Sequence, residues 1–451
     1  MIEAGFIVPS VSFVERWFII VKVLWLANGP ISKVSNYLGR KGGISWIDGM
    51  FDSLRLYDKT NYITKIIVCF PSYDVLEVEY GTVDEKLEYV MFPASKKSPD
   101  IYIKEQEQYF ENVIKRKKPD IIHIFGTEYP HSLAMAKVAN KINAIEKVVV
   151  NIQGLTSISG QYHYFAGLEG KVIHSATIRD ILKKDNIFKQ SYKFRKRGFY
   201  EVETLKLVKN VIGRTDWDKA CTYLNNDKLN YYFCNETLRD VFYTGKWSLS
   251  ECEKYSLFFS QSYYPVKGFH CLLKILPYLL QKFPDLHIYT TGKNPLEANT
   301  FLKKQRQTYY DRYIAKLLID NHLENKVTYL GKLTAIEMKN RYLKSNVFVS
   351  ASSIENESNS ISEAKILGVP VVASYVGGVT DRIIHKTDGY FYPFNEPYML
   401  AYYIEKIFND EQSTNIISKN ARENALKLHD QRKNALALLE IYHSIIKRSS
   451  L

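Results

Sequence analysis

Residues 352–374, SSIENESNSISEAKILGVPVVAS, decide the fold of this 451-residue chain. They follow the apolar run NVFVSAS and end in a second one, VPVVAS. Such runs are typical of buried β-strands. Between them, residues 360–367 are predicted to form a short helix, which Gly368 and Pro370 end. A strand, a helix and a strand in this order indicate a βαβ unit in a parallel sheet.

Apolar runs alternate with amphipathic stretches along the rest of the chain. One such stretch, KGFHCLLKILPYLLQKFP, has leucines at helical spacing in spite of Pro277. This alternation predicts an α/β fold with parallel sheets. The runs expected to form strands are VKVLWLA, TKIIVCF, DIIHIFG, KVVVNIQG and KNVIGRT in the first half, and SLFFSQS, DLHIYTTG, KVTYLG, NVFVSAS and VPVVAS in the second.

The alternation pauses at residues 244–256, where polar and turn-forming residues dominate. We place a domain boundary there and predict two Rossmann-like, doubly wound domains, residues 1–246 and 247–451. The end of the chain is helical, and we expect these last helices to pack back on the N-terminal domain. Residues 1–20 precede the first predicted strand and are either an appendage or lie before a start of translation at Val21.

The composition is that of a globular protein with a basic surface. Hydrophobic residues make up 46% of the chain, and 61 Lys and Arg against 48 Asp and Glu give a formal net charge of +13. That charge favours an anionic partner, namely nucleic acid, anionic lipid or a phosphorylated ligand. No nucleic-acid-binding motif accompanies it, so we expect no nucleic acid partner. The five cysteines have neither metal-binding nor disulfide spacing, and a cytoplasmic location is predicted.

The quoted stretch also indicates a ligand site at the start of its helix. The backbone N–H groups of Asn359, Ser360, Ile361 and Ser362 begin this helix, and unpaired donors of this kind bind phosphate or diphosphate. Glu363 is expected in the first turn. The alternative is a capping box, in which the Ser360 and Glu363 side chains satisfy each other's backbone N–H groups.

The order of these features resembles a known donor site. Two glutamates in the pattern E-x7-E, an apolar helix, LGVPVVAS and then VGG are similar to the signature of retaining nucleotide-sugar glycosyltransferases of family 4, the glycosyl transferases group 1. The resemblance implies a GT-B fold of two Rossmann-like domains facing across a cleft, with the donor bound by the C-terminal domain. It also implies that Glu355 lies beside the transferred sugar, that residues 359–362 hold the diphosphate, and that Glu363 binds the ribose hydroxyls.

A second motif matches the family's donor site, with one departure. SQSYYPVKG resembles the loop after the first strand of the donor domain, which makes Lys267 the expected diphosphate cation and second catalytic residue. Many members have an arginine five residues before this lysine, where this chain has Ser262. Arg214 or Arg239 is the expected substitute, and we place Arg214 at the acceptor side of the cleft.

Motifs in the N-terminal half match the remaining parts of the site. GRKGG resembles the family's glycine loop, in which Gly42 and Gly43 let the backbone approach the donor phosphates. KPDIIHIFGTEYPHS resembles the strand and helix that border the acceptor pocket, with Glu128 and His131 at the end of the strand. Gln153 stands where the family often has a histidine, and unlike histidine it cannot titrate.

One further motif, TDWD (215–218), imitates the D-x-D metal site of another glycosyltransferase class. It follows a predicted strand and has the composition of a capped helix start with acids in the first turn. We therefore predict a helix start there and no metal site, as the GT-B resemblance also implies. No cofactor is expected either, because the nucleotide sugar is a substrate.

The segment from Lys183 to Gly198, KKDNIFKQSYKFRKRG, combines seven basic side chains with isoleucine and three aromatic residues. It either lies on an anionic membrane surface, at the inner face of the plasma membrane, or is a solvated helix face. A membrane location suits a polyprenyl-linked acceptor. We thus expect a retaining hexosyltransferase that acts on a glycan or lipid-linked oligosaccharide in capsule, O-antigen or exopolysaccharide synthesis. The alternative is a non-catalytic GT-B-like subunit that binds a nucleotide or glycan.

Overall fold

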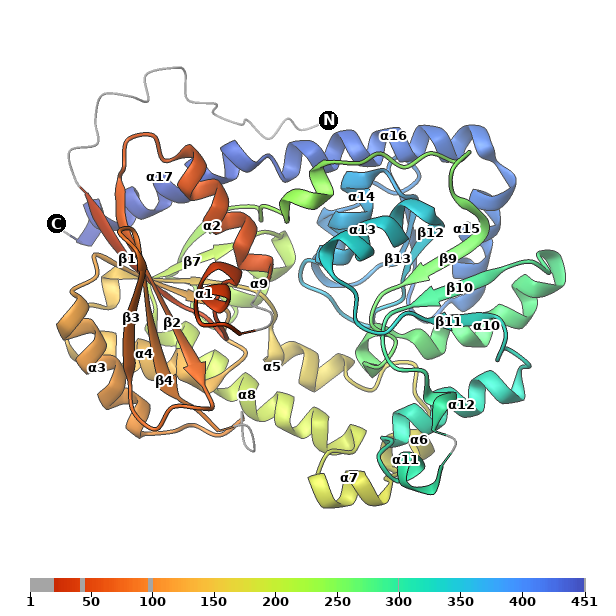
Figure 1. Cartoon of the computed structure of the whole chain (residues 1–451), viewed down its shortest axis with the longest axis horizontal. Helices are drawn as coiled ribbons and strands as arrows, with labels where there is room; N and C mark the ends of the chain where they lie inside the picture. Colours follow the sequence, from red (N-terminus) through yellow and green to blue (C-terminus); the bar gives the residue numbers. More distant parts are fainter. Residues whose placement is uncertain (1–19, 41–44, 96–99, 299, 450–451) are drawn as a thin grey trace.

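Two α/β domains face each other, each built on one sheet with helices on both sides (Figure 1). The predicted class of two doubly wound domains is confirmed. The appendage expected at the N-terminus lies, except for residue 20, outside the described residues. This computed structural model describes residues 20–40, 45–95, 100–298 and 300–449.

The N-terminal domain contains an eight-stranded sheet. Its strands are β1 (Val21–Leu26), β2 (Ile63–Ser72), β3 (Glu79–Asp84), β4 (Leu87–Pro93), β5 (Ile121–Phe125), β6 (Val148–Asn151), β7 (Asn210–Gly213) and β8 (Asn230–Phe233). They lie in the order β3-β4-β2-β1-β5-β6-β7-β8, and each neighbouring pair is parallel except the antiparallel β3 and β4. Parallel order brings the carboxyl ends of the central strands to one edge.

Helices cover both faces of this sheet. They are α1 (Ser32–Tyr37), α2 (Ser45–Tyr57), α3 (Glu105–Lys117), α4 (Pro130–Lys141), η1 (Ile145–Lys147), α5 (Thr156–Ile158), α8 (Ile187–Leu207) and α9 (Asp216–Tyr223). Between α5 and α8 the chain extends to the C-terminal domain through η2 (Ser159–His163), α6 (Gly170–His174) and α7 (Ile178–Lys183) (Figure 1). In β1, Val23 and Trp25 pack in one core cluster with α2, whereas Leu24 and Leu26 pack in another with α3 and α4. Because both faces are buried, every residue of the strand except the half-buried Lys22 is apolar, which makes β1 visible as an apolar run in the sequence.

The C-terminal domain contains a six-stranded, fully parallel sheet in the order 11-10-9-12-13-14. Its strands are β9 (Glu253–Phe259), β10 (His287–Thr290), β11 (Val327–Tyr329), β12 (Ser345–Ser350), β13 (Val371–Ser374) and β14 (Tyr390–Tyr392). The segment between β8 and β9 contains η3 (Asp240–Tyr243) and connects the two sheets. It includes the predicted boundary at residue 246.

Helices also surround the second sheet. They are η4 (Pro265–Lys267), α10 (Phe269–Lys282), η5 (Pro295–Glu297), α11 (Phe301–Gln305), α12 (Tyr309–Asp320), α13 (Ala335–Lys344), α14 (Asn359–Leu367), η6 (Gly377–Asp381), α15 (Pro397–Asn409) and α16 (Glu411–Leu428). After them comes α17 (Gln431–Ser449), which leaves this domain. The predicted leucine helix is α10, which contains Pro277 and buries Leu272, Leu276 and Leu279 completely.

The last helix, α17, returns to the N-terminal domain and packs against α2 (Figure 1). Its Tyr442 hydroxyl accepts a hydrogen bond from Trp25 Nε1 (3.1 Å) and lies 2.7 Å from His123 Nδ1. His123 is fully buried in β5, and burial lowers its pKa to about 3. The C-terminal helix is therefore part of the N-terminal core and ties the two domains together.

Candidate functional site

The loop between β12 and α14 joins the domains at the carboxyl ends of their strands. Its Asn356 side chain accepts a hydrogen bond from Thr215 Oγ1 (3.2 Å) and donates one to Gln153 O (3.2 Å). Gln153 and Thr215 follow strands β6 and β7, so both lie at the carboxyl edge of the N-terminal sheet. Doubly wound folds bind ligands at this edge. The loop that carries Glu355 therefore lies between two ligand-binding edges.

Glu355 forms an ion pair with Lys267. Lys267 Nζ lies 2.5 Å from Glu355 Oε1, which also accepts a hydrogen bond from Ser352 Oγ at 2.7 Å. The two side chains are 13% and 26% exposed, so a ligand can reach both. Gly268 positions the lysine: its φ is +75°, and a Cβ there would lie 1.8 Å from Ala351 O. This tight contact leaves room only for glycine.

Helix α14 begins at Asn359, one residue earlier than predicted, with Ser358 as its N-cap. The N–H groups of Ile361 and Ser362 donate to Ser358 O at 2.9 and 3.1 Å. In the described part of the chain, no acceptor lies at the N–H groups of Asn359 and Ser360. Two backbone donors, rather than the expected four, therefore remain for an anion.

The capping-box alternative is wrong. Glu363 lies in the second turn of α14, and the N-cap makes no side-chain hydrogen bond. Glu363 Oε1 instead accepts a hydrogen bond from Arg239 Nη2 at 2.5 Å. Burial raises the pKa of the Glu363 carboxyl, and the Arg239 guanidinium opposes this rise. The acid thus faces a cation from the segment that links the two domains.

The structure separates the two candidates for the missing cation. Ser262 is buried, and its hydroxyl donates to Thr291 O at 3.0 Å. The Arg214 side chain is 1% exposed and is paired with carboxylates inside the protein. The Arg239 side chain is 24% exposed and lies beside α14 through Glu363. This geometry favours Arg239 over Arg214 as a ligand-facing cation.

A buried acid, Glu357, was missed by the sequence reasoning. Its carboxylate pairs with Arg214 Nε of the N-terminal domain at 3.0 Å and with Arg382 Nε of the C-terminal domain at 3.2 Å. Arg214 also pairs with Glu236 of the linking segment, and all four side chains are at most 3% exposed. Glu357 is visible in the sequence as an additional acid between Glu355 and Glu363. The neighbouring residues, however, do not distinguish a buried structural acid from a ligand-binding one.

A pocket lies at the carboxyl edge of the N-terminal sheet. It is lined by Asn28 after β1, Tyr73 after β2, Ile101, and Tyr129 and His131 at the start of α4. His131 Nε2 lies 2.9 Å from Asn28 Oδ1. Burial lowers the pKa of His131 to about 4, so the imidazole is neutral at pH 7. The pocket thus offers aromatic and neutral polar groups, a lining suited to a sugar.

Glu128 lies in the loop just before α4, the helix that carries His131. Burial, reinforced by the nearby Glu201 carboxylate, raises the pKa of Glu128 to about 7. Glu201 itself accepts hydrogen bonds from the Thr156 and Ser157 N–H groups at 2.9 and 3.1 Å and so orders the segment after β6. Farther along the edge, Gln153 Nε2 donates to Asn151 Oδ1 at 2.7 Å. The predicted acceptor residues thus share one edge, and Arg214 lies beneath it.

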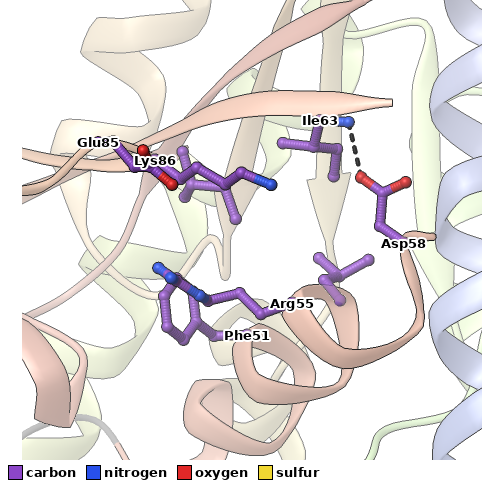
Figure 2. Close-up of a pocket in the computed structure, with 8 residues that line it drawn as sticks. Phe51, Arg55, Asp58, Ile63, Glu85 and Lys86 are labelled. Carbon is purple, nitrogen blue, oxygen red and sulfur yellow. Dashed lines mark hydrogen bonds between the residues drawn. The ribbon is translucent and has the colours of Figure 1, made fainter. Parts of the chain in front are cut away.

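A second pocket, drawn in Figure 2, lies elsewhere on the N-terminal domain. Phe51, Arg55 and Asp58 line it from α2 and its end, together with Ile63 and Lys86. Asp58 Oδ2 accepts a hydrogen bond from the Ile63 N–H at 2.8 Å. Because Ile63 begins β2, this pocket lies at the amino ends of the parallel strands, opposite the edge where such folds bind ligands. We assign no site to it.

The remaining predictions concern metals, glycines and membranes. TDWD begins α9 as predicted, and the Thr215 side chain accepts a hydrogen bond from the Asp218 N–H. Within residues 20–449, apart from the gaps given above, no three His, Cys, Asp or Glu residues gather as metal ligands. None of the helices in the same part of the chain is long and apolar enough to cross a bilayer. Gly42 and Gly43 lie outside the described residues.

Comparisons with known sequences agree with this arrangement. Residues 246–424 match the family model "Glycosyl transferases group 1". The chain is 24% identical over 196 residues to the putative glycosyltransferase YtcC of Bacillus subtilis, covering 43% of this chain and 46% of that protein. It is 26% identical over 194 residues to the D-inositol 3-phosphate glycosyltransferase of Pseudarthrobacter chlorophenolicus, covering 43% and 44%. The chain thus matches about half the length of these curated relatives.

Solved structures resemble the whole chain. Sucrose-phosphate synthase from Thermosynechococcus elongatus superposes with a TM-score of 0.66 at 14% identity, covering 95% of this chain and 100% of that one. Anabaena Alr3699/HepE in complex with UDP-glucose superposes with a TM-score of 0.62 at 15% identity, covering 93% and 99%. These likenesses confirm the predicted GT-B fold.

Proposed function

Because residues 246–424 match the glycosyl transferases group 1 model and the chain has the GT-B fold, we propose that it is a glycosyltransferase. Its donor is a nucleotide sugar, and it transfers a hexose with retention to a glycan or a lipid-linked oligosaccharide. The observation that carries this proposal is the partly exposed Lys267–Glu355 pair near the two free N–H groups at the start of α14. Cation, carboxylate and helix N-terminus together match a sugar diphosphate.

Each group has a role in breaking the bond between the sugar and the diphosphate. Negative charge grows on the diphosphate oxygen as this bond breaks, and Lys267 with the N–H groups of Asn359 and Ser360 stabilises it. Glu355 orients the sugar hydroxyls or stabilises the positive anomeric carbon. The acceptor hydroxyl oxygen then bonds to that carbon, and its proton passes to the diphosphate. No metal or cofactor is needed in this scheme.

The nucleoside part of the donor is held farther along α14. In the proposed complex Glu363 accepts hydrogen bonds from the ribose hydroxyls, while Arg239 supplies the positive charge that Ser262 does not. Anabaena Alr3699/HepE, which has a similar fold, was solved with UDP-glucose, which supports a nucleotide diphosphate sugar as donor class. The acceptor is proposed to bind in the pocket beside Glu128 and His131.

The proposed cellular role is cell-surface polysaccharide synthesis at the cytoplasmic face of the membrane. The basic segment 183–198 supports it, because each basic residue near an anionic leaflet contributes about 1 kcal/mol of binding. A polyprenyl-linked acceptor would be presented at that surface.

The first experiment is a thermal-shift panel of UDP, GDP, ADP and their sugar derivatives. A ligand at a hundredfold excess over Kd should stabilise the fold by about 2.7 kcal/mol. We expect one nucleotide to do so, and Glu363→Gln to weaken the shift while Glu423→Gln, a change at an exposed acid, leaves it intact. If no nucleotide stabilises the well-folded protein, the donor site is wrong.

The second experiment separates an enzyme from a non-catalytic binding subunit. We expect slow donor hydrolysis or transfer to a lipid-linked glycan, lost in Glu355→Gln with nucleotide binding retained. Binding without turnover under any acceptor condition would support the non-catalytic alternative instead.

A further inference from the structure

Helix α7 presents an unusual apolar face to solvent. Ile178, Ile181 and Leu182 are 59%, 62% and 79% exposed. Their spacing of three and four residues places them on one side of the helix. The opposite side is anchored, because Thr177 and Asp180 are buried and form a capping box. The fold therefore fixes α7 with its apolar side outward.

A second exposed apolar pair lies on the neighbouring helix α11 of the other domain. Phe301 and Leu302 are 75% and 71% exposed. Thr177 Oγ1 donates to Gln307 O at 2.9 Å, and the Tyr309 N–H donates to Asp180 Oδ2 at 2.8 Å. These bonds hold α7 to the segment after α11, and Figure 1 shows both helices at the same end of the molecule.

Exposed basic side chains flank these five apolar residues along the chain and outnumber the exposed acids there. Three of the acids nearby are already paired, and Glu297, four residues before Phe301, is exposed. Asp180 caps α7 and pairs with Arg179, which also lies 2.9 Å from Asp185. Asp311 caps α12. The exposed basic residues on the two helices and just after them are Lys183, Lys184, Lys303, Lys304 and Arg306.

We infer that this surface, formed by α7 and α11, docks on an anionic lipid bilayer. Apolar side chains at its centre enter the boundary between headgroups and acyl chains, and the basic side chains contact the headgroups. A second copy of the chain is a poorer occupant, since a symmetric contact would bring two basic surfaces together. Lysine is also depleted at the core of protein interfaces.

The surface differs from the basic segment recognised in the sequence. Within residues 183–198, Ile187 is buried and the Phe194 ring packs 5.0 Å from that of Tyr164. Both pack toward the protein interior, whereas Phe188 and Tyr192 are 41% and 60% exposed. The segment contributes Lys183 and Lys184 to the docking surface, whereas the five exposed apolar side chains of that surface come from α7 and α11.

The docking surface is connected to the candidate site. Between α5 and α7 the chain passes through η2, whose His163 carbonyl accepts a hydrogen bond from Ser353 Oγ at 3.0 Å. Ser353 lies two residues before Glu355 in the loop that joins the domains. Only the following step rests on the proposed function. A bilayer docked at α7 would present a lipid-linked acceptor on the side of the molecule where η2 connects the docking surface to the candidate site.

The test is flotation of the full chain with vesicles of phosphatidylcholine alone or with one-quarter phosphatidylglycerol. We expect binding to the anionic vesicles that weakens with salt, and at least a tenfold loss for Leu182→Ser combined with Phe301→Ser. The matched control combines Leu224→Ser with Ile416→Ser, which lie 84% and 54% exposed elsewhere, and should bind like wild type. A second variant, Lys183→Ala with Lys184→Ala, should lose anionic selectivity without altering the apolar centre.

Several results would overturn the inference: no wild-type binding, equal binding to neutral vesicles, or undiminished binding by both variants. Dimerisation without vesicle binding, abolished by the double serine variant, would identify a second copy as the occupant. The nucleotide thermal shift provides an independent readout. If a variant loses vesicle binding but keeps the nucleotide thermal shift, only the docking surface is affected. If the wild-type protein shows no nucleotide thermal shift, the donor site is wrong, whatever the vesicle result.

Discussion

Replacing Glu357 with glutamine should strongly destabilise the protein and weaken the coupling between its domains. The substitution keeps the size of the side chain but removes the negative charge between Arg214 and Arg382. Glu236 can balance one of these guanidinium groups. The other would remain buried without a counter-charge.

The expected magnitude follows from burial. The Glu357 side chain is 0% exposed, and the two arginine side chains are 1% and 3% exposed. Removing one partner from a buried ion pair costs about 3–5 kcal/mol, because the remaining charge has lost both water and its partner. For a domain of about 150–250 residues, each kcal/mol lowers Tm by about 2–4 °C. The Tm should therefore fall by about 6–20 °C.

Differential scanning calorimetry of the full chain measures this effect. Glu423→Gln is the matched control, because Glu423 is 54% exposed and lies 3.9 Å from Lys419, so its Tm should change little. We also expect the domains of Glu357→Gln to unfold in separate transitions, since the lost acid joins an arginine from each domain. A Tm within 2 °C of wild type would refute the reasoning, because it would mean that water already reaches the guanidinium groups.

Three further predictions follow from the pKa values and the backbone. Burial lowers the pKa values of His123 and His270 to about 3 and those of His131 and His429 to about 4. Histidine in the unfolded chain titrates near 6.5, so these four side chains together take up about four protons on unfolding near pH 5. Their contribution to the free energy of unfolding, present at pH 7, therefore falls by about 5 kcal/mol for each pH unit of acidification near pH 5. Urea unfolding at pH 7, 6 and 5 measures this slope, and a pH-independent midpoint would contradict it. The pKa of Glu128 is raised to about 7. Its ionisation above pH 7 should lower the KM for the acceptor but leave the KM for the donor unchanged, and Glu128→Gln should abolish this pH dependence. Gly268→Ala should weaken nucleotide binding, measured by titration calorimetry, at least tenfold, because the added Cβ collides with Ala351 O and displaces Lys267 from Glu355. Unchanged affinity would show that Lys267 does not bind the diphosphate.

Much of the fold was predictable because its signals are local. Strands buried on both faces are rich in apolar residues, so β1, β12 and β13 appear in the sequence as short apolar runs. The end of α14 was equally readable, since Gly368 adopts a φ of +86° that favours glycine. Its start was harder, because Ser358 caps the helix through its backbone without a side-chain hydrogen bond.

The sequence by itself determined the two α/β domains, the position of α14 and the placement of Glu355 in the loop before it. Only the tertiary structure decided which charges meet: Glu363 pairs with Arg239, 124 residues away, and Glu357 joins an arginine from each domain. The physical reason is one of range. Backbone propensity and apolar periodicity depend on neighbours within a few residues, whereas the state of an ionisable group depends on its burial and on charges brought near by the path of the whole chain.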